Sequence, residues 1–380
     1  MDIEAEPLSL LRERTSLKWR AFPDDVLPLF VAELDYPLAE PIRDALFEAV
    51  RRSDTGYAAS AAPLADAFAA FAARRWGWHV DPRQVVATNE VGSAVVEVLR
   101  MILAPGDEVV ITPPVYPPFF DLVPEAGGRV IDVPLLHGQT GWTLDLDGLE
   151  AALRRGARAV LLCNPQNPLG HPHGIEDLTA LAELAERYGA FVVSDEVNAP
   201  LTYSAESFTP YLTVSPAAAR HGVCVTSAST AWNLAGLTCA LIVTASERMR
   251  LLTSALPPGI RERTGHLGLL ASTAAFRYGG PWLDAARTAL EENRGLLAGL
   301  LDAHLGGVGY EQPRAGYLAW LDLRSLGWGD DPAAVALERA KVALMPGLLF
   351  GATGAGFARL NFGCSPEVLS EAVSRIAAAT

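Results

Sequence analysis

Apolar and polar positions along the chain follow two periods, one typical of amphipathic helices and one typical of buried strands. Between residues 40 and 280, helical patterns at 64–76, 93–103 and 175–188 alternate with short apolar runs that end in polar or turn residues. Such runs are typical of strands in a mostly parallel sheet that is buried on both faces. The alternation therefore predicts an α/β fold with a doubly wound sheet. The expected strands are 85–88, 108–112, 159–163, 190–194 and 223–227.

The last hundred residues show a different arrangement. A long helical pattern at 282–305 leads to two segments, 316–321 and 356–362, that we expect to be strands of a smaller domain. A chain of 380 residues exceeds the size at which one hydrophobic core usually stops growing. One large domain and one smaller domain are therefore expected.

Charge and composition indicate an ordinary enzyme of the cytoplasm. The net charge is −14 and no basic run occurs, so nucleic acid and anionic membrane are poor candidates for partners. The first six residues, MDIEAE, are acidic where a signal peptide would be basic, and no apolar stretch approaches the length of a membrane span. The four cysteines, which we expect to be reduced core thiols without a role, are Cys163, Cys224, Cys239 and Cys364.

The stretch 227–237 reads SASTAWNLAGL and carries the most information about function. It resembles the cofactor-lysine segment, S-A-S-K-x-x-N-L-A-G-L, of fold-type I pyridoxal-phosphate (PLP) enzymes, in their cystathionine β-lyase-like (MalY/PatB) C–S lyase branch. Thr230 stands at the position of the lysine. A threonine hydroxyl cannot form the imine by which a lysine amine holds the PLP aldehyde and later moves protons at the substrate α-carbon.

The resemblance covers essentially the whole chain, because further motifs follow in the order of that branch. It implies a fold-type I aminotransferase with a large domain at 41–280 and a small domain formed by both chain ends, 1–40 and 281–380. It also implies a homodimer with shared sites, in which Tyr57 reaches the cofactor phosphate of the neighbouring subunit. The further motifs are SLKW at 16–19, LFVAELDY at 29–36, GY at 56–57, VYPPFF at 115–120, NPQNPLG at 164–170, SDE at 194–196 and RLNF at 359–362.

Four matching residues imply recognition of the cofactor ring and of a substrate. Asp195 would pair with the pyridine nitrogen, although it could instead cap a helix after its strand. Asn167 would bind the ring 3-oxygen and Tyr116 would stack on the ring, although Asn-Pro also forms turns and Tyr116 lies in a Pro-rich loop. Arg359 would clamp a substrate carboxylate, and its apolar neighbours suggest a buried, paired arginine and not a surface one.

The phosphate end of the site departs from the resemblance. Ser227 and Ser229 remain as cofactor-binding hydroxyls, but Thr238 replaces the basic residue that binds the phosphate eight positions after the lysine. The small residues at a helix N-terminus that admit the phosphate become NEVG at 89–92. The carboxylate of Glu90 would either repel the phosphate or cap the helix harmlessly, and both readings stay open.

Other residues offer little replacement chemistry. The only two lysines are Lys18, in a segment that the family already has, and Lys341, before an expected strand of the small domain, so neither is a good substitute for the missing amine. His171 and His173 lack a third ligand nearby, so we read them as surface residues and expect no metal site. Asn198 stands where the family often has histidine and is a candidate substrate-binding residue.

Three functional hypotheses follow. The first is a diverged enzyme that acts on a carboxylate-bearing, amino-acid-like or N-heterocyclic molecule without a PLP–lysine link, either with no cofactor or with PLP or pyridoxamine phosphate bound noncovalently. Thr230, Tyr57 and Tyr116 would be its catalytic residues. The second is a conventional PLP-dependent cystathionine β-lyase or aminotransferase. The third is a non-catalytic partner of an active relative.

Overall fold

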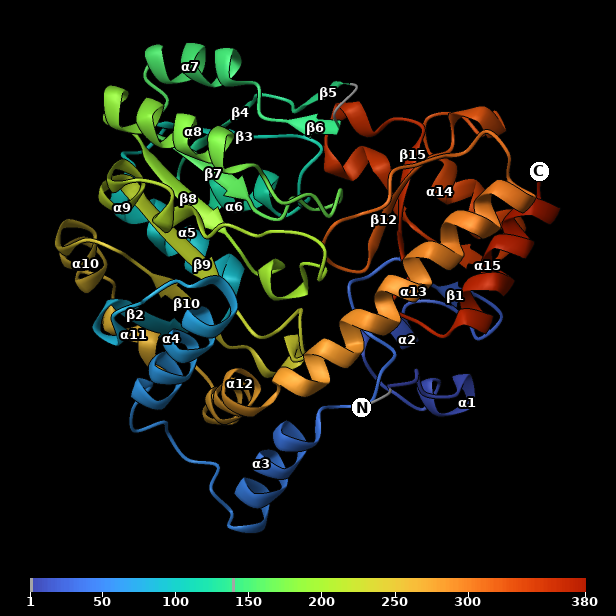
Figure 1. Ribbon diagram of the computed structural model, residues 1–380, viewed down its shortest axis with the longest axis horizontal. Helices are drawn as coiled ribbons and strands as arrows, with labels where there is room; N and C mark the ends of the chain where they lie inside the picture. The colour runs from blue at the N-terminus through green and yellow to red at the C-terminus, as the bar shows by residue number, and fades with distance from the viewer. Residues whose placement is uncertain (1–2, 139–140) are drawn as a thin grey trace.

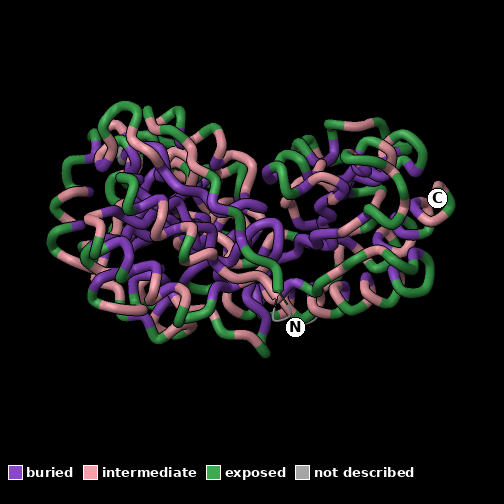
Figure 2. The backbone as a smooth tube through the Cα atoms, turned by 90° about the horizontal axis from the view of Figure 1, so that it is seen from above, coloured by how far each residue is buried: buried purple, intermediate pink, exposed green. Residues whose placement is uncertain are grey.

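The computed structural model describes residues 3–138 and 141–380 and shows a larger and a smaller body side by side. Helix α13 (Gly280–His304) runs from the larger body along the smaller one (Figure 1). Buried backbone passes through the centre of both bodies, whereas exposed segments lie on the outside (Figure 2). Within the described residues, no helix combines the length and the apolar character needed to cross a membrane.

The centre of the larger body is a seven-stranded sheet in the order β2-β10-β9-β8-β7-β3-β4. All pairings are parallel except those of β10, which runs antiparallel to both of its neighbours. The expected α/β fold with a mostly parallel sheet is therefore confirmed. The strands are β2 (Val85–Thr88), β3 (Glu108–Ile111), β4 (Arg129–Asp132), β7 (Ala159–Cys163), β8 (Phe191–Asp195), β9 (Gly222–Thr226) and β10 (Ala240–Val243).

The central strands are mostly apolar because both faces of the sheet are covered. Alternate residues of β7 belong to different cores: Ala159 and Leu161 face one cluster, whereas Val160 and Leu162 face the other. Helices α5 (Val91–Ile102) and α6 (Phe119–Glu125) contribute to the first cluster, and α7 (Leu146–Arg154) and α8 (Ile175–Tyr188) contribute to the second. This two-sided burial explains why these strands read as continuous apolar runs.

Two further long helices pack together on the larger body. They are α4 (Ala62–Trp76) and α12 (His266–Tyr278), and α12 also packs against α3 (Glu40–Arg51). The Ala-rich segment before Trp76 is thus helical, and Gly77 ends α4 in the left-handed region with φ of 63°. A glycine there avoids the strain that a Cβ atom would add.

The smaller body contains a four-stranded antiparallel sheet in the order β11-β12-β15-β14. Near it, the N-terminal strand β1 (Leu27–Pro28) pairs with β13 (Val342–Ala343), so the two ends of the chain come together. The domain boundaries themselves, 1–40 with 281–380 against 41–280, stay a prediction. The sheet strands are β11 (Gly309–Tyr310), β12 (Leu318–Asp322), β14 (Met345–Pro346) and β15 (Phe357–Asn361), and α13 packs against α15 (Pro366–Ala378).

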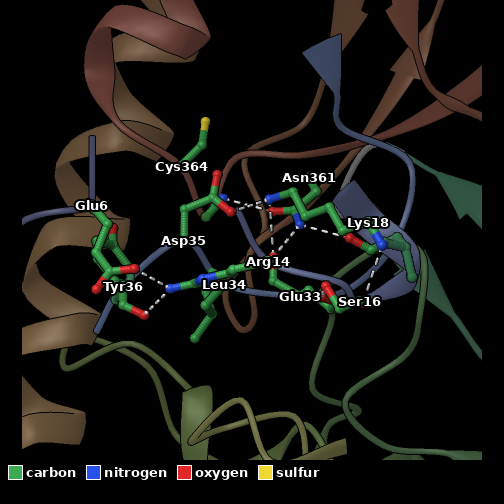
Figure 3. A network of polar contacts seen from close by, with 12 residues as sticks. Glu6, Arg14, Ser16, Lys18, Glu33, Leu34, Asp35, Tyr36, Asn361 and Cys364 are labelled. Atoms are coloured by element: carbon green, nitrogen blue, oxygen red, sulfur yellow. Dashed lines mark hydrogen bonds and ion pairs between the residues drawn. The ribbon is translucent and has the colours of Figure 1, made fainter. Parts of the chain in front are cut away.

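A buried ion pair fixes the segment that follows β1. Lys18 Nζ lies 2.6 Å from Asp35 Oδ1, and both side chains are almost fully buried. Lys18 also donates to the carbonyl of Glu33 at 3.2 Å, and the Asn361 side chain donates to the carbonyls of Val31 and Glu33, each at 2.7 Å (Figure 3). The segment 31–35 is thereby attached to β15.

We predict that Lys18→Met will lower the free energy of unfolding by about 3 to 5 kcal/mol, because it leaves the Asp35 carboxylate buried without its cation. The double change Lys18→Met with Asp35→Leu should recover most of this loss, since no charge is then buried. Denaturant unfolding measures both effects, and Arg83→Met, which breaks an exposed pair with Asp81, is the control that should change nothing measurable. If Lys18→Met is as stable as the parent protein, the assignment of Lys18 and Asp35 as a buried ion pair is contradicted.

Candidate functional site

The candidate site lies at the edge of the large sheet where its parallel strands end. Asp195 is the last residue of β8, and Asn167 and Tyr116 lie in the loops after β7 and β3. Thr230 follows β9 and Glu90 follows β2. Because the carboxyl ends of parallel strands share one edge, the fold brings these loops to the same side of the sheet.

Asp195 is a buried carboxylate without a cationic partner. Its Oδ1 accepts a hydrogen bond from the backbone N–H of Val197 at 3.1 Å, which stabilises the loop and does not cap an α-helix. Burial raises the pKa of Asp195 to about 7, and among the described residues no arginine, lysine or histidine opposes this effect. The site therefore suits a ligand that brings a cationic or N–H-bearing nitrogen to this carboxylate.

Arg359 on β15 is a buried guanidinium whose hydrogen-bond partners are neutral. Nη1 donates to Asn167 Oδ1 at 3.1 Å and Nη2 donates to the carbonyl of Phe30 at 2.9 Å, whereas the buried Nε has no partner among the described residues. Burial lowers the pKa of Arg359 to about 10. The arginine is buried, as expected, but its partners do not neutralise its charge, so an anionic ligand group would complete the balance.

Tyr116 and Asn167 stand beside these two charges. Tyr116 is partly buried, and burial first, then the charge of Asp195, raises the pKa of its hydroxyl to about 12. At neutral pH this hydroxyl is thus a proton donor and not a base. Asn167 uses its side-chain oxygen for Arg359, and its side-chain N–H groups make no hydrogen bond to the described residues.

The loop that carries Thr230 is held by residues other than a lysine. The Ser227 hydroxyl donates to the carbonyl of Cys239 at 2.6 Å and accepts from the N–H of Ser229 at 2.9 Å. The backbone carbonyl of Thr230 accepts from the Tyr317 hydroxyl at 3.4 Å, whereas its own hydroxyl bonds to none of the described residues. Ser227 therefore stabilises the loop, and the cofactor contact that the resemblance implied stays a prediction.

Neither lysine supplies an amine here. Lys18 is committed to Asp35, and Lys341 is exposed in a turn with φ of 55° before β13. Thr238 is also exposed, in the left-handed region with φ of 46°, and it brings no charge. Neither lysine is therefore placed to act as a substitute amine at the Thr230 loop, and the loss of the covalent link to PLP stays a prediction.

Three other expected residues lie around the site. Tyr57 is fully exposed, and Asn198 is partly buried where the loop after β8 turns into a short 3-10 helix, Ala199–Leu201. Glu90 is exposed at the start of α5, and its charge contributes to the raised pKa of Tyr116. Their expected contacts with a cofactor, a substrate or a second subunit stay predictions.

The placement of the two loop histidines on the surface was wrong. His173 is buried, with Nε2 at 3.2 Å from the carbonyl of Cys163, and partly buried His171 accepts from Arg314 at 2.5 Å. Burial lowers the pKa of His171 to about 3 and that of His173 to about 4, so both are neutral. Over the parts of the chain that the structure describes, no group of three or more His, Cys, Asp or Glu residues could hold a metal ion.

Sequence reasoning missed two contributors to the site. The carbonyl of Phe30 binds Arg359, and Tyr317 links Thr230 to the carbonyl of Ala32 at 3.0 Å. A backbone acceptor carries no signal in the sequence, although the motif at 29–36 marks the segment. The buried aromatic position at Tyr317 was read only as part of a strand.

Comparison with known proteins assigns the family. The sequence profile of the aminotransferase class I and II family matches residues 25–376. The chain belongs to this family. Within the family, the cystathionine beta-lyase of Corynebacterium glutamicum is 35% identical, with 97% of this chain and 98% of that protein covered. A candidate cystathionine beta-lyase of Mycobacterium tuberculosis (strain CDC 1551 / Oshkosh) is 43% identical, with 98% and 97% covered.

A solved structure supports the same branch. A candidate PLP-dependent beta-cystathionase from Corynebacterium diphtheriae superimposes with a TM-score of 0.94 at 35% identity and covers 99% of this chain and 98% of that one. The fold is therefore that of a fold-type I aminotransferase, and the relatives of the chain are C–S lyases. PLP is the cofactor that this family implies.

The described residues fit one part of PLP and not the other. The buried carboxylate of Asp195 fits the pyridine nitrogen, and the free amide of Asn167 and the ring of Tyr116 fit the ring. No lysine amine meets the aldehyde, and Thr238 offers no positive charge to the phosphate. The described residues thus offer partners for the ring of PLP, and they include no amine that could hold its aldehyde.

We predict that Asp195→Asn will stabilise the ligand-free protein at pH 8 by on the order of 1 to 3 kcal/mol. The folded-state pKa is raised to about 7 from 3.8, so the cost of burying the carboxylate is fully present above pH 7 and disappears as the pH falls toward 4. Denaturant unfolding at several pH values measures the difference, which should shrink below pH 7. The exposed control, Asp302→Asn, should show no such trend, and a pH-independent difference for Asp195→Asn would contradict the argument.

Proposed function

We propose that this chain is a diverged member of the C–S lyase branch that binds a carboxylate-bearing, amino-acid-like or N-heterocyclic small molecule without a covalent bond between protein and PLP. The observation that carries the proposal is the pair of buried, unneutralised charges, Arg359 and Asp195, beside a loop whose lysine position is Thr230. Arg359 would bind the carboxylate of the ligand and Asp195 its nitrogen. The pocket would thus keep the recognition chemistry of the family.

Hydroxyl groups are the candidates for proton transfer in this proposal. Tyr116 donates at neutral pH because its pKa is raised to about 12. The Thr230 hydroxyl has no bonding partner among the described residues, so it is free to meet a ligand. PLP or pyridoxamine phosphate, if bound noncovalently, would supply an electron-withdrawing ring above Asp195.

A second candidate is the reaction named for the relatives, PLP-dependent cystathionine β-elimination. The identity of 35% to the enzyme of Corynebacterium glutamicum, over nearly the full length of both chains, favours it. Thr230 opposes it, because no other amine in the described structure replaces the lysine. The two candidates differ in whether the parent chain turns over cystathionine.

We predict that Arg359→Met will weaken the binding of N-pyridoxyl-L-alanine, a ring compound with a carboxylate, by about tenfold or more, since a charge-assisted hydrogen bond contributes on the order of 1.5 to 3 kcal/mol. Binding of pyridoxamine, which lacks the carboxylate, should change little. Isothermal titration measures both. Arg324→Met is the matched control, because Arg324 is an exposed arginine that pairs with Asp322 at the end of the same sheet.

Two results would contradict the proposal. If Arg359→Met weakens the binding of N-pyridoxyl-L-alanine and of pyridoxamine equally, with an unchanged thermal midpoint of unfolding, then Arg359 does not bind the carboxylate. Release of pyruvate from cystathionine by the parent chain with added PLP, at rates comparable to those of Thr230→Lys, would favour the second candidate.

We also propose a homodimer in which the exposed Tyr57 belongs to the site of a second copy. Tyr57 lines an open groove of about 450 Å³ together with Gly236 and Leu237, which follow the Thr230 loop, and with residues 262–268. In such a dimer a second copy would cover this fully exposed tyrosine. We predict that light scattering will give twice the 40.4 kDa chain mass and that Tyr57→Ala will weaken ligand binding without dissociating the dimer. A monomer would refute the proposal.

A further inference from the structure

The N-terminus of α5 carries a carboxylate at a position where a helix would otherwise attract an anion. Glu90 is the N-cap residue, but its side chain makes no capping hydrogen bond to the backbone of the helix. Its Oε1 instead accepts from the Ser93 hydroxyl at 3.1 Å, and it would lie 3.3 Å from a Cβ atom added to Gly92. The carboxylate is therefore folded back against the first turn of α5.

This position has an electrostatic consequence. The first turn of a helix presents unpaired N–H groups and a partial positive charge, which normally favour an incoming phosphate. Here the negative charge of Glu90 already lies at the first turn of α5. A phosphate dianion bound at the same turn would lie close to this like charge and would be repelled. The side chain of Glu90 makes no hydrogen bond to the helix amides, so it interacts with this end of α5 through its charge.

The neighbouring loop does not compensate for this negative charge. Thr238 is neutral and exposed, and the hydroxyl hydrogen of Ser227 is donated to the carbonyl of Cys239. Arg263 lines the same open groove as Gly236 and Leu237, but it does so next to the acidic residue Glu262. None of these groups places a committed positive charge at the start of α5.

We infer that this pocket selects against phosphate and that its ligand is a phosphate-free molecule carrying one carboxylate and at least one cationic or N–H-bearing nitrogen. The inference rests on the proposed function, because it uses Arg359 for the carboxylate and Asp195 for the nitrogen. It adds that Glu90 excludes the phosphorylated form of the same ring. Tyr116 is near all three charges, since, after burial, those of Asp195 and Glu90 raise the pKa of its hydroxyl and that of Arg359 lowers it. Arg359 also reaches the loop after β7, where Nη1 donates to Asn167 Oδ1 at 3.1 Å.

A matched pair of probes tests this inference. Pyridoxamine and pyridoxamine 5′-phosphate share a ring and differ only in the phosphate, so the ratio of their dissociation constants measures how the pocket treats that group. The parent protein should bind pyridoxamine at least as tightly as its phosphate ester. Glu90→Gln should tighten binding of the ester about tenfold and leave pyridoxamine within about twofold, and adding Thr238→Arg should tighten the ester about tenfold again.

Two controls accompany these variants. Glu97→Gln removes another acid from α5, one that pairs with Arg100, and should alter neither probe. Arg263→Gln should also leave the binding of the ester unchanged, and a loss there would show that Arg263 binds the phosphate and overturn the inference.

The remaining outcomes separate the inference from the proposed function. If the parent protein binds the phosphate ester tenfold more tightly than pyridoxamine, the inference fails and the proposed function stands. The inference also fails if Thr230→Lys alone gives a yellow protein that keeps PLP through dialysis. If neither probe nor N-pyridoxyl-L-alanine binds, the proposed function fails and the inference fails with it.

Discussion

The attachment of the N-terminal segment to the two bodies is the constraint on which the site depends. Asn233 donates to the carbonyl of Leu34 and accepts from its N–H, each at 3.0 Å, so the Thr230 loop and the N-terminal segment are joined by a two-point contact. Asn361 and the Lys18–Asp35 pair hold the same segment from the other side. Because the carbonyl of Phe30 then reaches Arg359, the position of the guanidinium depends on a segment more than 320 residues away in the chain.

The fold buries two opposite charges, those of Arg359 and Asp195, in its nonpolar interior, and the two groups do not form an ion pair with each other. Arg359 is oriented by an amide and a carbonyl, and Asp195 is oriented by one backbone N–H. Burying either charged group costs free energy relative to leaving it in water, and the large hydrophobic cores offset that cost. Such preorganised charges give a pocket its selectivity, since a ligand gains from them without any rearrangement of the protein.

The sequence predicted the sheet well because burial on both faces leaves a direct pattern of apolar runs. The expected strands at 85–88 and 159–163 match β2 and β7, and the others differ by one or two residues at their ends. Two strands of the sheet, β4 (Arg129–Asp132) and β10 (Ala240–Val243), were not predicted. β4 lies at the edge of the sheet and is only partly buried, so it lacks an apolar run.

The site was predicted only in part. Asp195, Asn167 and Tyr116 were assigned from the resemblance, and the structure places all three at the ends of parallel strands of one sheet. The burial of His173 did not, because it arises from contacts with Cys163 and with Gln166, at 3.3 Å from the histidine Nε2, which the linear pattern does not reveal. The neutral partners of Arg359 were equally hidden, because one of them is a backbone atom of a distant segment.

The burial of Lys18 has a practical consequence for amine chemistry. The amine of Lys18 is buried against Asp35, so Lys341 is the one lysine whose side chain reaches solvent. An aldehyde or an active ester added to the native protein therefore meets a single lysine, far along the chain from the Thr230 loop. Replacing Lys341 with arginine would give a scaffold without an accessible lysine, on which a lysine introduced at a chosen position would be the one lysine side chain open to labelling.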